Sequence, residues 1–178
     1  DLHTGSVMVR GSGPDGEPGG QPSTARAIDS EFGFCGPVAF DLGALWANYL
    51  IAATRGAALN DVTHQDWCLD LVVRTWTAFE EEFRRLWPTR VDPRVWHEEL
   101  EEHLLAHWRE DAWLFAAAKM ARRIVGLAKT SDIDTLNADV RAPAARSVLA
   151  VARASVRHRE GDSSPESLVA LARSLQPS

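Results

Sequence analysis

Lysine and cysteine are scarce in this chain of 178 residues, and each scarcity argues against some classes of function. Lys119 and Lys129 are its only lysines, so positive charge comes almost wholly from arginine, and the formal net charge is −6. This acidic balance argues against nucleic acid as the main partner. The 2 cysteines, Cys35 and Cys68, lack zinc-ligand spacing and do not indicate a disulfide framework, which favours a reducing, cytoplasmic compartment.

The sequence also lacks long apolar runs, targeting signals and a nucleotide-binding loop. No apolar run reaches the ~18 residues that a membrane-spanning helix needs, so no membrane partner is expected. No signal peptide is visible, and no glycine-rich phosphate loop ends in GKS or GKT. The chain lacks an initiator methionine and begins within a motif, which predicts that it is the C-terminal part of a longer protein.

Hydrophobic residues make up 45% of the sequence, enough for one domain with a sizeable core. A mostly apolar stretch over 38–54 is typical of a buried helix, and a turn follows over 56–60. Apolar periodicity and capping residues predict further helices over the ranges 61–87, 92–108, 111–128, 139–158 and 164–175. The pattern therefore predicts a mainly α protein.

Two short strand-like runs precede these helices. Val7-Met8-Val9 and the run that begins at Thr24 are joined by a Gly/Pro-rich stretch over 11–20, which predicts a β-hairpin with a flexible loop. The sequence thus divides into a hairpin region, residues 1–36, and a helical body, residues 37–178.

An antiparallel hairpin would gather several polar residues at one end. The start of its first strand lies beside the end of its second, which brings Asp1 and Ser6 toward Asp29 and Glu31. Two carboxylates two residues apart in extended chain point the same way, and such paired oxygens suit Mg²⁺. Asp1 would then be free to accept a proton from an attacking hydroxyl group, as phosphoryl transfer requires. Ordinary turn acids at strand ends are an equally good interpretation of the spacing.

Asp41 and a pair of arginines each allow two interpretations. Asp41 stands among apolar residues, where it either meets a helix dipole or accepts hydrogen bonds from the loop that contains Asp1. Arg122 and Arg123 lie near a predicted helix end, and their spacing favours cations that complement the helix dipole. The functional alternative is an anion clamp, because guanidinium groups offer planar, forked donors.

Four segments resemble the 5-methylthioribose kinases, in the order in which that family has them. Asp1 to Val9 resembles the family's catalytic loop, HGDLHTGS, and Ile28 to Pro37 resembles its IDPEFAFYGP segment. Phe40 to Asn48 is similar to its FDxGAxxAN helix, and Met120 to Ala128 to its RRIVGLA stretch with twin arginines. Aminoglycoside and choline kinases share the general protein-kinase-like fold, but they usually carry Asn in place of Ser6 and lack the arginine pair.

The resemblance implies roles at the hairpin. Asp1 would be the base that accepts the proton of the sugar 1-hydroxyl group. Asp29 and Glu31 would hold Mg²⁺ on the phosphates of ATP, and Ser6 is a candidate for a metal or phosphate contact. Ser30 stands where the family usually has Pro, a small change between two retained carboxylates.

The resemblance also implies roles in the helical body. Arg122 and Arg123 would bind the substrate and stabilise the transferring phosphoryl group, and Asp41 would brace the catalytic loop. The chain would be the C-terminal lobe of a kinase that converts ATP and 5-methylthioribose to ADP and 5-methylthioribose 1-phosphate in methionine salvage, and the family is homodimeric. A related kinase for another hydroxyl acceptor, such as a different sugar, an aminoglycoside or a choline-like alcohol, and a non-catalytic helical fragment are the alternatives. Because the N-terminal lobe is absent, the 178 residues alone are expected to be inactive.

Overall fold

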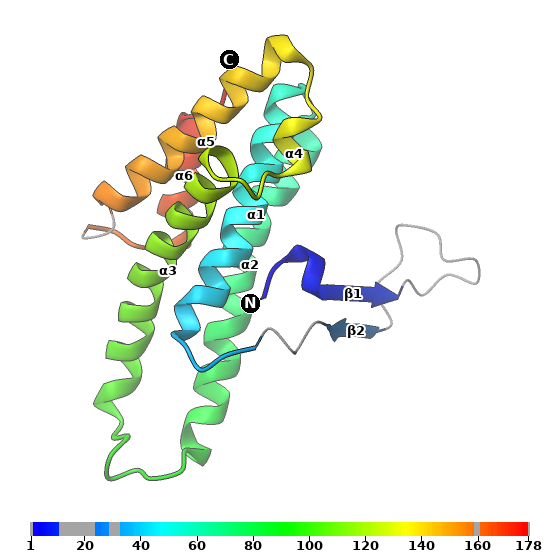
Figure 1. Cartoon of the computed structure of the whole chain (residues 1–178). Helices are drawn as coiled ribbons and strands as arrows, with labels where there is room; N and C mark the ends of the chain where they lie inside the picture. The colour runs from blue at the N-terminus through cyan, green and yellow to red at the C-terminus, as the bar shows by residue number, and fades with distance from the viewer. Residues whose placement is uncertain (1, 11–23, 29–32, 159–160, 178) are drawn as a thin grey trace.

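The computed structural model describes residues 2–10, 24–28, 33–158 and 161–177, and these ranges form a helical body that carries one small hairpin (Figure 1). The prediction of a mainly α protein is confirmed. The strands and α-helices in chain order are β1 (Val7–Arg10), β2 (Thr24–Ala27), α1 (Val38–Ala58), α2 (Val62–Leu86), α3 (Glu99–Val125), α4 (Ser131–Asp134), α5 (Ala138–His158) and α6 (Pro165–Ser174), and short 3₁₀ helices cover Thr4–Ser6 and Trp87–Thr89. Among the described elements, no helix is long and apolar enough to cross a bilayer.

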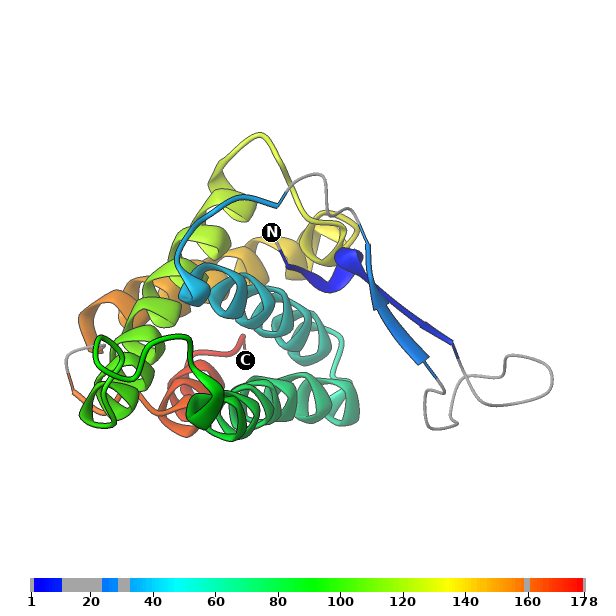
Figure 2. The same cartoon turned by 90° about the horizontal axis from the view of Figure 1, so that it is seen from below.

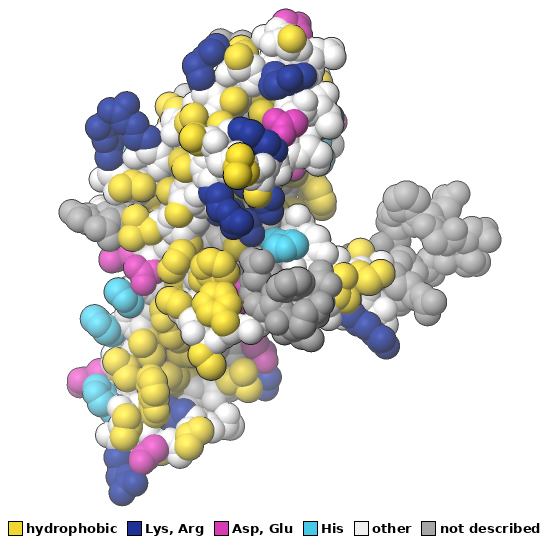
Figure 3. All heavy atoms as spheres, viewed as in Figure 1, with side chains coloured by type: hydrophobic (Ala, Val, Ile, Leu, Met, Phe, Trp, Pro, Cys, Tyr) yellow, Lys and Arg dark blue, Asp and Glu magenta, His cyan; other side chains and the backbone are white. Residues whose placement is uncertain are grey.

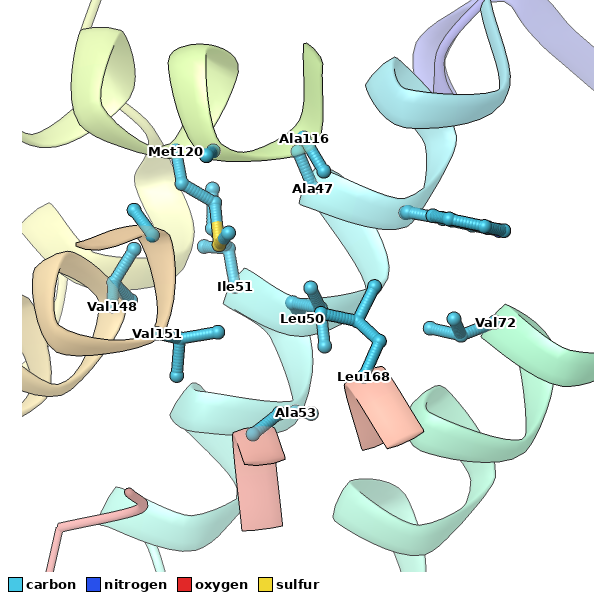
Figure 4. Packing of buried hydrophobic residues seen from close by; sticks show 14 of the residues in the cluster. Ala47, Leu50, Ile51, Ala53, Val72, Ala116, Met120, Val148, Val151 and Leu168 are labelled. Atoms are coloured by element: carbon cyan, nitrogen blue, oxygen red, sulfur yellow. The ribbon is translucent and has the colours of Figure 1, made fainter. Parts of the chain in front are cut away.

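Helix α1 is the centre of the body. It packs against α2, α3, α4 and α5, and α6 lies against α2 and α5. Its side chains are buried on most faces, as the apolar run predicts, and Trp46 and Ile51 are almost inaccessible. Figure 4 shows Ile51 beside Met120 of α3, and Leu50 beside Leu168 of α6, on the side that faces Val72 of α2. Burial of apolar side chains from six helices is the main source of stability.

Helices α1 and α3 lie close together at Gly43. A Cβ atom placed there would lie 2.6 Å from the carbonyl oxygen of Ala112, 2.6 Å from the Cβ of Phe115 and 2.8 Å from the backbone nitrogen of Ala116. Two of these neighbours are backbone atoms, which cannot rotate away. Only glycine therefore allows this separation, and the contact fixes how the N-terminal part of α1 packs on α3.

The sequence predicts two separate helices over 92–108 and 111–128. This prediction is wrong, because one continuous helix, α3, covers most of both ranges. The residues between them, Arg109 and Glu110, are good helix formers and give no reason for a break. Asp92 and Pro93 open a single turn, in which the carbonyl oxygen of Asp92 accepts hydrogen bonds from the backbone nitrogens of Val95 and Trp96. The helix itself begins only at Glu99.

Arg84 links the C-terminal end of α2 to the N-terminal end of α3. Arg84 pairs with Glu80 one turn earlier at 2.8 Å. It also reaches across to Glu101 and Glu102 of α3. Arg85, its neighbour, pairs only with nearby Glu82 among the described residues, and both of those side chains are largely exposed.

The hairpin leaves the helical body beside the start of α1 and projects away from it (Figure 2). Its strands are antiparallel, with Val7 opposite Ala27 and Arg10 opposite Thr24. The backbone nitrogen of Ile28 donates to the carbonyl oxygen of Ser6 at 2.8 Å, which extends the pairing by one residue. The predicted arrangement, with the start of the first strand beside the end of the second, is confirmed. The loop over 11–20 lies outside the described residues.

Candidate active site

The loop before β1 is a compact turn. A short 3₁₀ helix covers Thr4–Ser6, and the backbone nitrogen of Ser6 donates to the carbonyl oxygen of His3 at 2.8 Å. The ring nitrogen Nδ1 of His3 accepts from the backbone nitrogen of Gly5 at 3.1 Å. Ser6 is buried, with 3% of its surface exposed. The turn thus sets the direction in which the chain enters the hairpin.

Asp41 links this loop to the helical body. It lies in the first turn of α1, where a carboxylate complements the helix dipole. Its Oδ1 atom also accepts a hydrogen bond of 2.6 Å from the backbone nitrogen of Leu2, 39 residues earlier in the chain. The two interpretations of Asp41 are therefore compatible in one geometry. A hydrogen bond to a charged acceptor is stronger than a neutral one, so Asp41 holds the loop at the residue that follows Asp1.

The carboxylates assigned to proton and metal chemistry, Asp1, Asp29 and Glu31, lie outside the described residues. Their described neighbours, Leu2 and Ile28, are held by the contacts to Asp41 and to Ser6. Two carboxylates separated by one residue are a donor set that fits Mg²⁺, a hard cation with oxygen ligands. Among the described residues alone, no three His, Cys, Asp or Glu side chains group as metal ligands.

Arg122 and Arg123 occupy the last turn of α3, as predicted. The guanidinium group of Arg123 donates to the carbonyl oxygens of Ala128 and Lys129, each at 3.4 Å, and so turns toward the chain beyond the helix end. The side chain of Arg122 is exposed. Gly126 ends the helix, and a Cβ atom there would lie 2.4 Å from the carbonyl oxygen of Arg122. The glycine therefore lets the chain turn away close behind the arginine pair.

A cation one turn before the arginine pair, Lys119, was not predicted from the sequence. Its side chain is half-buried. Burial lowers the pKa of its ammonium group, the charges of Arg123 and Arg122 lower it further, and the charge of Asp41 opposes them. Lys119 lies four and three residues after Phe115 and Ala116, the residues of α3 that approach Gly43 of α1. The signal in the sequence was the spacing from Lys119 to the arginine pair, three and four residues, which puts all three cations on neighbouring parts of one helix face.

A cavity of about 350 Å³ opens beside the loop and Asp41. Its wall is largely apolar and is formed by Leu2, Gly33, Phe34, Gly36, Pro37, Val38, Phe40, Asp41, Leu42 and Phe79. The ring of Phe40 contacts Phe34 edge-on, with ring centres 5.4 Å apart, and contacts Phe115 of α3 in the same way at 5.5 Å. This aromatic series joins the chain after Glu31 to both α1 and α3. A cavity with apolar walls and one carboxylate suits a small ligand with both apolar and polar parts.

Helical body, hairpin and braced loop together are consistent with the C-terminal lobe of a protein-kinase-like small-molecule kinase. No family model matches the chain. It is 32% identical to the methylthioribose kinase of Escherichia coli, over 86% of this chain and 38% of that protein. It is 34% identical to the methylthioribose kinase of Geobacillus kaustophilus, over 89% of this chain and 37% of that protein, and 30% identical to methylthioribose kinase 1 of Oryza sativa, over 89% and 39%.

These matches confirm the resemblance that the four motifs indicate: the chain is related to the methylthioribose kinases. It spans about two fifths of the length of the relatives that it matches.

Proposed function

We propose that this chain is the C-terminal lobe of an ATP-dependent methylthioribose kinase. The observation that carries the proposal is similarity to methylthioribose kinases over 86% or more of the chain. The hydrogen bond from Leu2 to Asp41 supports it, because it anchors the loop in which the resemblance puts the catalytic base.

In this proposal, the 1-hydroxyl oxygen of 5-methylthioribose attacks the γ-phosphorus of ATP. The bond from phosphorus to the bridging oxygen breaks, ADP leaves, and Asp1 accepts the hydroxyl proton. Mg²⁺ held by Asp29 and Glu31 would neutralise charge on the phosphates, and Ser6 would add a metal or phosphate contact. Arg122 and Arg123 would stabilise the negative charge of the transferring group from the end of α3.

The cavity beside Asp41 would receive the methylthio arm of the substrate. Its aromatic walls include Phe34, Phe40 and Phe79, and thioether sulfur contacts aromatic rings favourably. Asp41 lies at the edge of the cavity, where its carboxylate accepts the hydrogen bond from the backbone nitrogen of Leu2. The acceptor hydroxyl would therefore lie at the loop end of the cavity and the methylthio group among the rings.

The test is the acceptor specificity of the full-length protein, which includes the N-terminal lobe that this proposal requires for ATP binding. Release of ADP is measured with methylthioribose, ribose, choline and an aminoglycoside as acceptors. Methylthioribose is expected to give the highest kcat/KM. Preference for another acceptor would support a related kinase, and no turnover with any acceptor would support the non-catalytic fragment. The 178 residues alone are expected to be inactive, and turnover by them would contradict the need for an N-terminal lobe.

Substitution of the arginine pair gives a second test in the same assay. Arg122→Ala is expected to lower kcat/KM for methylthioribose on the order of 10²-fold, because a cation at the developing charge is lost. Arg146→Ala, which removes an exposed arginine of α5, is the matched control and should leave kcat/KM unchanged. Equal effects of the two substitutions would remove Arg122 from the proposed site.

The resemblance further implies a cytoplasmic homodimer. Light scattering of the full-length protein is expected to give twice the mass of one chain, and a monomer would contradict this part of the proposal.

A further inference from the structure

Phe79 brings α2 into the wall of the cavity beside Asp41. The other two aromatic rings in that wall, Phe34 and Phe40, belong to the segment that precedes α1 and to its first turn. Among the described residues that line the cavity, all come from the loop, that segment or the start of α1 except Phe79. The second helix of the body therefore contributes to the cavity through this one ring.

Three neighbouring rings hold Phe79 in place. Its ring centre lies 5.7 Å from that of Trp76 and 6.1 Å from that of Phe83, both on the same helix. The ring of Trp108 on α3 meets it edge-on, with centres 6.0 Å apart. Trp76 is itself buried, with 3% of its surface exposed. Side chains packed in this way do not change rotamer without moving their neighbours, so Phe79 is a rigid part of the wall.

The helix that carries Phe79 is also fixed to α3. Arg84, five residues further along α2, pairs with Glu101 at 3.2 Å and with Glu102. The contact between Phe79 and Trp108 joins the same two helices. Movement of Phe79 away from the cavity would therefore require α2 and α3 to separate.

The aromatic ring nearest to the surface is held less firmly. Figure 3 shows hydrophobic side chains gathered on the surface over the start of α1. Phe34, whose ring meets that of Phe40 edge-on, is 60% exposed. An exposed side chain turns aside with little loss of packing, whereas a packed one does not. Only a ring that keeps its place can reject a longer substituent, so Phe79 rather than Phe34 would set the limit.

We propose that Phe79 is a specificity-determining residue of the acceptor site, and that its ring limits the size of the 5-alkylthio group that the kinase accepts. This inference rests on the proposed function, which places the methylthio group among these rings, and adds the residue that selects the substrate by size. The competing role is that of a core ring that joins α2 to α3 and touches no substrate.

Acceptor kinetics of the full-length protein test the proposal. Release of ADP is measured with 5-methylthioribose and 5-butylthioribose for the wild type, Phe79→Ala and Phe79→Leu. Phe79→Ala is expected to raise the ratio of kcat/KM for the butylthio sugar to kcat/KM for the methylthio sugar by roughly tenfold or more, because the space that the ring fills becomes free. Phe79→Leu should raise the same ratio by less. A ratio within one protein is independent of the fraction that is folded, and Phe79→Leu carries the test if Phe79→Ala does not fold.

Phe83→Ala is the matched control. Phe83 stacks on Phe79 in the same aromatic layer but is not among the described residues that line the cavity. Its removal should destabilise the protein and leave the ratio of the two kcat/KM values unchanged. An unchanged ratio in the folded Phe79 variants, or an equal rise in Phe83→Ala, would overturn the proposal and leave Phe79 as a core ring.

The same measurements separate the inference from the function on which it rests. A wild-type protein that phosphorylates neither sugar refutes the proposed function, and the role of Phe79 with it. A protein that phosphorylates methylthioribose, with a ratio that neither Phe79 variant alters, refutes only the role of Phe79.

Discussion

Replacing Gly43 by alanine is expected to destabilise the protein, although the same change in an ordinary helix interior is stabilising. Alanine favours the helical state over glycine by about 1 kcal/mol. Against this, the new methyl group would lie 2.6–2.8 Å from three atoms of α3, of which two belong to the backbone. Overpacking of a core costs about 1–3 kcal/mol, and the upper value applies because backbone atoms cannot move aside. The net expectation is a loss of about 2 kcal/mol.

Denaturation by urea, followed by the fluorescence of the 7 tryptophans, measures this loss. A change of about 2 kcal/mol corresponds to a fall in Tm of roughly 4–8 °C for a chain of this size. Gly161→Ala is the control, because the nearest atom to its new methyl group lies at an ordinary contact distance of 3.5 Å. A Gly43→Ala protein as stable as the wild type would refute the close approach of α1 and α3 on which the placement of Asp41 and Lys119 depends.

Three further predictions concern contacts elsewhere in the chain. Arg84→Ala is expected to cost about 1 kcal/mol in urea denaturation, allowing for solvent screening of a side chain that is 37% exposed, whereas Arg85→Ala should change nothing measurable. An equal effect of both would contradict the clamp between α2 and α3. Burial raises the pKa of the Cys68 thiol to about 11, so at pH 8 iodoacetamide should alkylate the exposed Cys35 and leave Cys68 unmodified until the protein unfolds. Asp41→Asn should lower kcat of the full-length enzyme about 10- to 100-fold with a small change in Tm, and unchanged kcat would end its assignment as a brace.

Local patterns in the sequence were sufficient to predict most helices and the hairpin. Apolar runs and caps define α1, α2 and α6; Asp61, for example, accepts a hydrogen bond from the backbone nitrogen of His64 at the start of α2. The end of α1 was predicted too early, because Gly56 suggests a turn. The helix continues to Ala58. Packing accounts for the glycine at position 56, because a Cβ atom there would lie 2.9 Å from the backbone nitrogen of Gln65.

Contacts between distant segments were harder to predict. The reach of Arg84 to Glu101 and Glu102 depends on how α2 and α3 pack, which no local pattern specifies. Lys119 was not predicted for the same reason. Its spacing to the arginine pair is visible in the sequence, but its position near α1 depends on how α1 and α3 pack. The cavity beside Leu2 likewise combines side chains from the loop, α1 and α2.

The site residues were predicted from the resemblance of motifs and from the chemistry of their side chains. Asp41 lies in the first turn of α1 and Arg122 in the last turn of α3, and their roles in the site stay predictions. Asp1, Asp29 and Glu31 lie outside the described residues, so their roles stay predictions. Spacing alone could not separate catalytic carboxylates from turn acids, because both favour the ends of short strands.

The most direct measurement of the central claim is ³¹P NMR of the reaction of the full-length protein with ATP and methylthioribose, for the wild type, Asp1→Asn and the control Asp70→Asn. The account predicts a new sugar 1-phosphate resonance that grows with ADP for the wild type and Asp70→Asn, and growth on the order of 10²- to 10⁴-fold slower for Asp1→Asn. Phosphate on another hydroxyl group, or an Asp1→Asn protein as fast as the wild type, would contradict it.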